Sequence, residues 1–175
     1  MGRGGYAPEM HATGNTAPFR IRPASSADAD DIAAVHTTSW RETYGSMVDD
    51  DVATSRWFDL GRRTEMWRAN FADGTYTPHV AVDERGIVGF GAARPAPEPD
   101  AVRPEELTML YVLARAHGTG AGQALLDAAL ADRPAYLWVA ADNPRARAFY
   151  RRNGFEHDGV ESTFGPVGVT HRLVR

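Results

Sequence analysis

A glycine-rich turn between an apolar segment and an alanine-rich segment constrains this chain most. Residues 106–113 are mostly apolar and rich in strand-forming types, whereas residues 121–126 are rich in Ala and Leu, which favour a helix. Between the two segments stand Gly118, Gly120 and Gly122. The first turn of a helix has unpaired backbone N–H groups and a partial positive charge, and glycines let an anion approach those groups closely. The sequence therefore predicts a site for a pyrophosphate group at this turn.

Two common phosphate-binding motifs do not fit this turn. The P-loop needs a Lys followed by Ser or Thr after its last glycine, whereas Gln123 and Ala124 follow Gly122. The dinucleotide fingerprint needs Gly or Ala three residues after its second glycine. Gln123 or Leu125 stands at that position in the two registers that the glycines allow. The predicted anion site is therefore neither a P-loop nor a dinucleotide site.

Composition indicates a soluble globular protein with a single domain. Of the 175 residues 43% are hydrophobic and 24% are charged, and no apolar run approaches the ~18–20 residues that cross a membrane. Residues 1–17 are rich in Gly and polar types, so we expect a flexible tail there and the domain over residues 18–175. The chain has no cysteine, which excludes disulfides, thiolate metal sites and a cysteine acyl-enzyme.

Charge argues against a nucleic-acid partner. The net charge is −4 and no dense basic stripe is present, whereas affinity for nucleic acid depends largely on neutralising phosphates. All 19 basic residues are Arg, which excludes lysine Schiff-base chemistry. We expect a cytoplasmic protein without nucleic-acid or membrane partners. The oligomeric state stays open, with a homodimer as one alternative.

Hydrophobic periodicity and turn residues predict an α/β (α+β) domain with the order strand, two helices, three strands, helix, strand, helix and two strands. The expected strands cover residues 19–22, 77–83, 87–94, 106–113, 135–140, 155–160 and 167–174. The expected helices begin at Ser25, cover residues 52–71, follow the glycine turn, and run from Pro144 to Asn153.

Local residue types predict several of the helix ends and loops. We interpret Asp49, Asp50 and Asp51 as acids that cap the second helix rather than as metal ligands. Residues 84–86 predict a hairpin turn. Three prolines at alternate positions predict a loop over Pro95–Asp100 that could border an active site.

A second motif follows the glycine turn and, together with it, resembles a known family. Asn143 follows the expected strand 135–140, and the next helix carries Tyr150 and is followed by Gly154 and Phe155. This pattern is a hallmark of the GNAT acyltransferase superfamily. The segment from His117 to Gly122 also resembles the acetyl-CoA motif of that family, which begins with Gln or Arg where this chain has His117. The resemblance covers roughly residues 19–175.

The resemblance implies a GNAT-like fold. We expect a mixed, mostly antiparallel sheet of about six to seven strands, flanked by about four helices. The sheet would be splayed between the parallel strands 106–113 and 135–140, with acyl-CoA lying in the split.

The resemblance also assigns residues to the acyl-CoA site. Backbone groups of Leu110, Tyr111 and Val112 would bind the pantetheine arm and polarise the thioester carbonyl. The pyrophosphate would contact the turn and the helix start, namely His117, Gly118, Thr119, Gly120, Ala121, Gly122 and Gln123. Asn143 matches a position that contacts the cofactor arm, and it is also a good helix cap.

Catalytic and acceptor residues follow from the same resemblance. Tyr150 matches the general acid that protonates the leaving thiolate, with a buried core tyrosine as the alternative. Glu106 stands where some relatives carry a base, and a solvated Glu is its alternative. Trp40, Tyr44 and the loop Pro95–Asp100 are candidates for the acceptor pocket. Trp138 stands near the place where relatives that acetylate ribosomal-protein N-termini carry a Glu, which argues against that branch.

We therefore predict an N-acetyltransferase that moves an acetyl group from acetyl-CoA to a primary amine by direct transfer in a ternary complex. The amine would belong to a small molecule or a peptide, and no metal is expected, because the histidines are scattered in the sequence. Two alternatives stay open. One is a non-catalytic acyl-CoA sensor with the same fold, and the other is an N-acyltransferase that uses a longer acyl-CoA.

Overall fold

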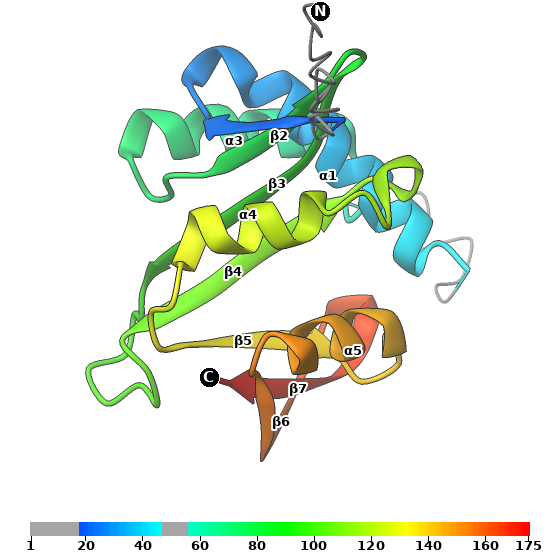
Figure 1. The fold of residues 1–175 in the computed structure, drawn as a ribbon. Helices are drawn as coiled ribbons and strands as arrows, with labels where there is room; N and C mark the ends of the chain where they lie inside the picture. The colour runs from blue at the N-terminus through cyan, green and yellow to red at the C-terminus, as the bar shows by residue number, and fades with distance from the viewer. Residues whose placement is uncertain (1–17, 47–55) are drawn as a thin grey trace, which may run out of the picture.

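The computed structural model describes residues 18–46 and 56–175. Seven strands form one mixed sheet, and helices cover both of its faces (Figure 1). The strands are β1 (Arg20–Pro23), β2 (His79–Asp83), β3 (Gly86–Pro95), β4 (Glu105–Val112), β5 (Ala135–Ala140), β6 (Glu156–Phe164) and β7 (Gly168–Val174). The helices are α1 (Ala29–Tyr44), α3 (Leu60–Asp73), α4 (Ala121–Leu130) and α5 (Pro144–Arg152), with short 3-10 segments η1 (Ser26–Asp28), η2 (Ala114–Ala116) and η3 (Gly165–Val167). The predicted fold class and order of elements are confirmed.

The sheet has the strand order β1-β2-β3-β4-β5-β7-β6, and its centre is split. The strands β4 and β5 are parallel and pair at only two positions, Glu105 with Ala135 and Glu106 with Tyr136. Beyond these pairs the two strands diverge, and the opening faces the C-terminal ends of both (Figure 1). Each strand is held on its other edge, β4 by β3 and β5 by β7. The splay expected from the family resemblance is therefore present.

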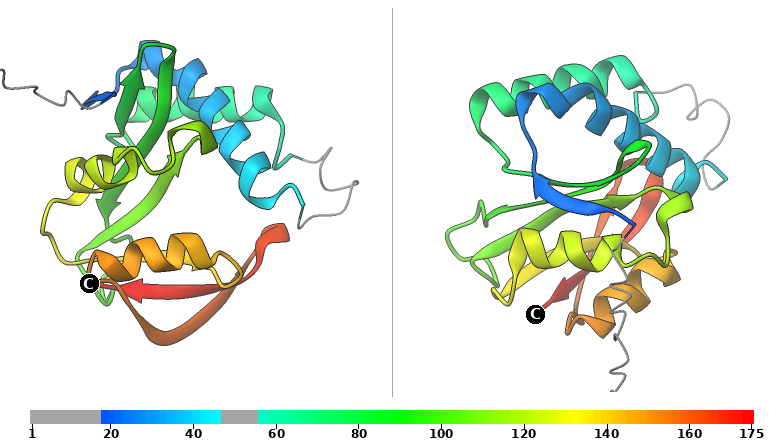
Figure 2. Two further views of the ribbon diagram at one scale, coloured as in Figure 1. Left: turned by 45° about the vertical axis from the view of Figure 1, so that its right-hand side comes forward. Right: turned by 45° about the horizontal axis from the view of Figure 1, so that its top comes forward.

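Three apolar clusters hold the helices to the sheet. The helices α1 and α3 pack on one face around Ile32, Trp67 and Phe90, which are fully buried. The helix α4 covers the opposite face through Leu125 and its neighbours (Figure 2). The helix α5 packs on β5 and β7 in a cluster that includes Tyr150. This last cluster also contains Leu107 of β4 and Leu126 and Leu130 of α4, so apolar contacts hold the two halves of the sheet together beside the split.

The helix α1 starts directly after residues 25–28, the segment at which the sequence predicts a helix to begin. The Asp28 carboxylate accepts hydrogen bonds from the backbone N–H and the hydroxyl of Ser25, at 2.8 and 3.0 Å. Arg22 on β1 binds the same carboxylate through both terminal nitrogens, at 2.6 and 2.8 Å. These bonds hold the pKa of Asp28 well below its usual range. The ion pair therefore links the first strand to the first helix.

The second predicted helix begins later than expected. Residues 52–55, and the acids Asp49, Asp50 and Asp51 before them, lie outside the described residues, as does the predicted tail 1–17. The helix α3 starts at Leu60 because the side chain of Asp59 accepts a hydrogen bond from the Arg62 N–H at 3.1 Å and so caps the helix. Trp57 therefore precedes the helix rather than belonging to it.

Two strand boundaries also differ from the expected ones. The strand β2 begins at His79 rather than at Thr77, since Pro78 has no N–H to donate to a neighbouring strand. The strand β6 extends to Phe164 rather than ending at Val160, because a bulge after His157 lets the pairing with β7 resume at Glu161. The remaining strands lie within one or two residues of their predicted ranges. Among the described residues no helix has both the length and the apolar character needed to cross a membrane.

A close approach of β3, β4 and α4 makes Gly89 a sensitive position. A Cβ atom on Gly89 would lie 2.7 Å from the carbonyl oxygen of Tyr111 and 3.1 Å from a methyl carbon of Leu125. We therefore expect Gly89→Ala to lower the free energy of unfolding by about 1–3 kcal/mol, because backbone atoms must shift. Urea denaturation measures the change.

Gly61→Ala is the matched control for this substitution. Gly61 lies in the first turn of α3, where a Cβ atom would meet the capping oxygen of the exposed Asp59 side chain at 3.3 Å, and a shift of a few tenths of an ångström relieves this contact. Alanine there should leave stability unchanged or raise it by up to about 1 kcal/mol. Equal effects of the two substitutions would mean that the close approach at Gly89 does not determine stability.

Candidate active site

A cleft of about 420 Å³ occupies the split between β4 and β5. The inner edges of both strands lack strand partners there, since the pairing ends at Glu106 and Tyr136. Backbone groups on these edges are therefore available to bind another molecule. The cleft is lined by Ser39, Thr43, Tyr44, Leu107, Thr108, Met109, Leu110, Tyr111, Val112, Ala116, His117, Gly118, Gly120, Gly122, Gln123, Trp138, Val139, Asn143, Arg145, Ala146, Phe149, Tyr150 and Arg152.

The glycine turn forms one end of the cleft. Gly118 and Gly120 have positive φ angles of 79° and 92°, which L-residues with side chains rarely adopt. A Cβ atom on either residue would meet nothing within 4 Å, so these glycines border open space rather than a packed interior. Gly120 caps the N-terminus of α4, whose first N–H groups have no helical acceptor. The turn is thus both accessible and partly positive, as an anion site requires.

Most of the residues predicted for the turn line the cleft, but two do not. Thr119 donates its hydroxyl hydrogen to the carbonyl of Ala116 at 2.8 Å, so its side chain stabilises the turn from within. Ala121 is fully buried in the cluster beneath α4. Any contribution of these two residues to a ligand would therefore come from their backbone.

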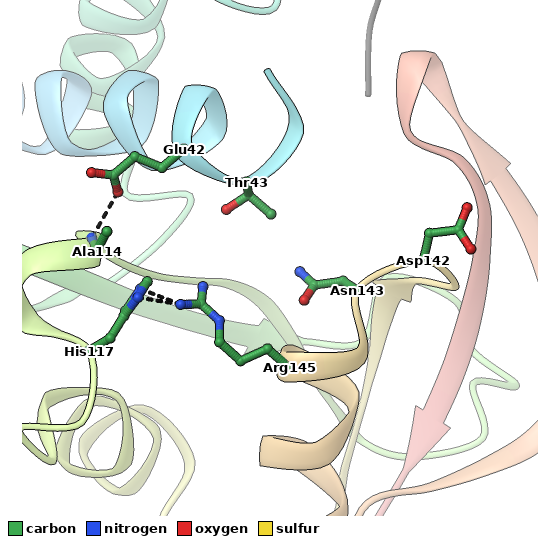
Figure 3. A pocket seen from close by; sticks show the side chains of 7 residues that line it. All are labelled: Glu42, Thr43, Ala114, His117, Asp142, Asn143 and Arg145. Atoms are coloured by element: carbon green, nitrogen blue, oxygen red, sulfur yellow. Dashed lines mark hydrogen bonds between the residues drawn. The ribbon is translucent and has the colours of Figure 1, made fainter. Parts of the chain in front are cut away.

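His117 lies at the mouth of the cleft beside an arginine that the sequence analysis did not single out (Figure 3). One ring nitrogen, Nε2, lies 3.0 Å from the Val112 carbonyl and 2.9 Å from Nη1 of Arg145. Arg145 belongs to the first turn of α5 and brings a permanent positive charge to the glycine turn. The permanent positive charge beside the turn therefore comes from α5, across the cleft.

The mouth of the cleft is built from three segments that are distant in sequence. Figure 3 shows the last turn of α1, the segment η2 and the start of α5 around this mouth. The cavity that their residues line has a volume of about 280 Å³. Glu42 accepts a hydrogen bond from the backbone N–H of Ala114 at 2.8 Å, which ties α1 to the segment before the glycine turn. Thr43 and Asp142 complete the rim. The sequence alone could not predict that these residues lie close together, because no regular spacing relates them.

Asn143 has the capping role that the sequence predicts. Its side-chain oxygen accepts a hydrogen bond from the Ala146 N–H at 3.0 Å, and Pro144 occupies the first turn of α5. Asn143 also lines the cleft and is hydrogen-bonded to Tyr44. The cap is therefore compatible with a second role toward a ligand.

Tyr150 belongs to a core cluster and also lines the cleft, whereas its role as general acid stays a prediction. Burial raises the pKa of its phenol above the ordinary value, and the nearby phenols of Tyr111 and Tyr44 add to this effect. The group therefore keeps its proton at any physiological pH. A protonated phenol at the cleft wall can donate a proton but cannot act as a resting base.

Glu106 does not line the cleft. Its carboxylate is 12% exposed and accepts hydrogen bonds from Nε and Nη2 of Arg94 at 2.9 and 2.7 Å. It lies at the last β4–β5 pair, where the sheet is closed. Glu106 is therefore engaged by Arg94 outside the cleft lining, and its role as a catalytic base stays a prediction.

The candidate acceptor residues separate into two groups. Tyr44 lines the cleft, whereas Trp40 lies behind it and donates its Nε1 hydrogen to the Tyr111 hydroxyl at 3.0 Å. Trp57 stacks on Trp40 with ring centroids 5.4 Å apart. Burial raises the pKa of Tyr111 to about 12, so its hydroxyl is a permanent hydrogen-bonding group. Trp40 thus positions β4 rather than forming the cleft surface.

The proline-rich loop after β3 is not part of the cleft lining. It lies beside the closed end of β4, and its Glu98 accepts a hydrogen bond from the Tyr136 hydroxyl at 3.2 Å. Residues that the sequence analysis missed include Arg145, Phe149 and Arg152 on α5. Their spacing along one helical face was visible in the sequence, but which face meets the cleft was not. Trp138 on β5 also lines the cleft.

Comparisons with known proteins agree with this architecture. An acetyltransferase (GNAT) domain model matches residues 74–157. The uncharacterized N-acetyltransferase YuaI of Bacillus subtilis is 30% identical over 156 residues, which cover 85% of this chain and 86% of that protein. A probable N-acetyltransferase of Mycobacterium tuberculosis is 28% identical over 173 residues, which cover 90% of this chain and 94% of that protein.

Solved structures share the fold at lower identity. The PaiA N-acetyltransferase of Thermoplasma acidophilum, crystallised with coenzyme A, superposes with a TM-score of 0.63 at 18% identity and covers 90% of this chain and 99% of that one. A structure from Corynebacterium glutamicum, described as histone acetyltransferase HPA2 and related acetyltransferase, gives a TM-score of 0.65 at 21% identity, covering 90% and 95% of the two chains. The chain belongs to the GNAT acyltransferase family and is an acyltransferase.

The cap at Asn143 can be separated from any ligand role by substitution. We expect Asn143→Ala to lower the free energy of unfolding by about 1 kcal/mol, because the Ala146 N–H loses its acceptor. Asn143→Ser should keep most of this stability, since serine caps helices well. Urea denaturation of the two variants measures both effects. Equal losses in both variants would mean that the side chain does not act as a cap.

Proposed function

We propose that this acyltransferase moves an acetyl group from acetyl-CoA to a primary amine by direct transfer in a ternary complex. The observation that carries the proposal is the split sheet, which leaves unpaired β4 and β5 edges along a cleft that ends at a glycine turn. A pantetheine arm carries amide groups that could pair with such an edge as an added strand would. The pyrophosphate would then lie at the N-terminus of α4.

The charged pyrophosphate and the neutral pantetheine arm of the proposed ligand each have matching partners. Amides from Gly118 to Gln123 would bind the pyrophosphate, and Arg145 would add a cation beside them. Leu110, Tyr111 and Val112 would offer backbone groups to the arm and the thioester carbonyl. The PaiA N-acetyltransferase, which binds coenzyme A in its crystal structure, supports the choice of ligand through its shared fold.

The chemistry requires one proton donor at the cleft wall. Attack of the neutral amine on the thioester carbonyl forms a C–N bond and breaks the C–S bond. Tyr150 would donate its phenolic proton to the departing thiolate, and the proton lost by the amine would pass to solvent and restore the phenol. The raised pKa of Tyr150 keeps the phenol protonated when the thiolate leaves, and it also makes the phenol a weaker acid toward that thiolate.

The acceptor would enter on the side of α1, where Tyr44 lines the cleft. The Tyr44 ring at this wall favours an amine with an apolar or aromatic part, and cation–π attraction would help to bind it before it loses its proton. The amine would belong to a small molecule or a peptide. Cytoplasmic location and the absence of nucleic-acid partners stay predictions of the sequence.

A thiol-release assay with acetyl-CoA and a panel of small amines and peptides tests the function. Release that depends on the amine, together with an acetylated product in the mass spectrum, supports the proposal. Tight acetyl-CoA binding without turnover on any amine would favour the sensor alternative. Faster turnover with a longer acyl-CoA would favour the second alternative.

The general-acid role predicts a specific kinetic defect in Tyr150→Phe. We expect kcat to fall by about 100-fold or more while the affinity for acetyl-CoA changes little. In the wild type, kcat should not fall between pH 7 and 10 through loss of the Tyr150 proton, since burial raises the pKa of that phenol above its ordinary value near 10. Steady-state kinetics and isothermal titration calorimetry measure the two quantities.

Tyr136→Phe is the control for this substitution. Tyr136 is a buried tyrosine on β5 whose hydroxyl binds Glu98, and it does not line the cleft. Its replacement should leave kcat within about twofold of the wild type. An unchanged kcat in Tyr150→Phe would refute the general-acid role, whereas equal defects in both variants would point to a general loss of packing.

The anion site predicts that Gly120→Glu abolishes coenzyme A binding. A glutamate there would fill open space at the N-terminus of α4 with a negative charge, where the pyrophosphate is expected. Gly74→Glu is the matched control, because Gly74 also has a positive φ of 65°, also has no atom within 4 Å of a Cβ, and lies at the end of α3. Calorimetry with coenzyme A should detect no binding to the first variant and normal binding to the second. Normal binding by a folded Gly120→Glu variant would refute the anion site.

A further inference from the structure

Three ligand-bearing side chains meet on the hairpin formed by β6 and β7, away from the cleft. His157 and Glu161 come from β6 and His171 comes from β7. Each offers one ligand atom, and these three atoms all lie within 4.8 Å of one another. None of the three residues lines the cleft between β4 and β5. The cleft between β4 and β5 therefore does not explain why these three side chains lie together.

A β-bulge brings the three residues together. His157 pairs with Leu173 and Glu161 pairs with His171, so four steps along β6 correspond to two steps along β7. The extra residues are accommodated at Gly159, which has a positive φ of 88°. A regular pairing would carry Glu161 past His171 along the strand. The bulge is thus what places both β6 side chains beside the same histidine.

A second set of contacts keeps the bulge in shape. Asp158 accepts a hydrogen bond from the Val160 N–H at 3.1 Å and forms an ion pair with Arg172 at 2.7 Å. These bonds occupy the Asp158 carboxylate, so Glu161 supplies the carboxylate of the cluster. The backbone that carries His157 and Glu161 is therefore held before any ligand arrives.

The distances within the cluster suit a small cation with nitrogen and oxygen ligands. The Nε2 atom of His171 lies 3.2 Å from Oε1 of Glu161. The rings of His157 and His171 are stacked with centroids 4.3 Å apart, so the exposed His157 ring must rotate before both rings direct a nitrogen to the same ion. Ligand atoms around tetrahedral zinc are about 3.3 Å apart, given bonds of about 2.0–2.1 Å. The His171 side chain is 14% exposed and forms a fixed point, whereas that of Glu161 is 58% exposed and can rotate to close the site.

We propose that His157, Glu161 and His171 form a binding site for a divalent transition-metal ion of the zinc class. Two imidazoles and one carboxylate favour zinc, copper or nickel over magnesium and calcium, which prefer oxygen ligands. Three protein ligands leave room for water in the remaining position. Because the ligands come from two strands, a bound ion cross-links the hairpin and stabilises the folded chain. The site is separate from acetyl transfer and does not depend on it.

Zinc binding to the full chain without an affinity tag tests the proposal. Calorimetry should show one Zn²⁺ ion per chain, and zinc should raise the melting temperature, while Mg²⁺ at the same concentration should do neither. His157→Asn and Glu161→Gln should each lower the zinc affinity by about tenfold or more, because each removes one ligand. Both residues are exposed, so these variants should fold, which circular dichroism can verify.

Two substitutions elsewhere serve as controls. Glu156→Gln changes an exposed acid on the same strand that does not belong to the cluster, and His79→Asn changes a histidine on β2, far along the strand order from β6. Both control variants should bind zinc as the wild type does. The absence of zinc binding to the wild type overturns the proposal. So does wild-type affinity in either His157→Asn or Glu161→Gln, since the ion would then bind elsewhere.

Discussion

The interrupted pairing of β4 and β5 is the constraint on which the rest of this structure depends. Two parallel pairs, at Glu105 and Glu106, join the halves of the sheet, and beyond them each strand has an edge without a strand partner. Unpaired backbone groups inside a protein are costly unless water or a ligand satisfies them. The fold tolerates the split because β3 and α4 support one half and β7 and α5 support the other. The cleft is thus a consequence of the topology.

Helix ends and one side chain decide the electrostatics at the open end of the cleft. The chain has a net charge of −4, yet the N-termini of α4 and α5 meet there and Arg145 adds a full positive charge. The local electrostatic potential depends on the arrangement of a few charged groups and helix ends, and not on the net charge of the chain. Arg145 places a permanent positive charge beside His117, with its Nη1 atom 2.9 Å from Nε2 of that histidine.

Buried polar groups link the cleft to α1. The indole of Trp40 binds the Tyr111 hydroxyl at 3.0 Å, and Tyr44 is bonded to the residue that caps α5. These contacts fix three elements around the cleft with groups that stay uncharged at neutral pH. The family resemblance suggested Trp40 as a pocket residue, but a sequence does not show whether an aromatic side chain lines a pocket or packs behind it. Only the packing distinguishes the two.

The sequence by itself determined the order of elements, most strand ranges, the cap at Asn143 and the glycine turn, because these depend on periodicity and on the backbone preferences of neighbouring residues. It also placed Tyr150 on the helix that lines the cleft. Tertiary structure alone decided that Glu106 pairs with Arg94, that Arg145 approaches His117, and that a bulge unites His157, Glu161 and His171. These contacts join residues 10 or more positions apart through strand register and helix orientation. Local residue preferences cannot fix such geometry, because it arises only when the elements pack together.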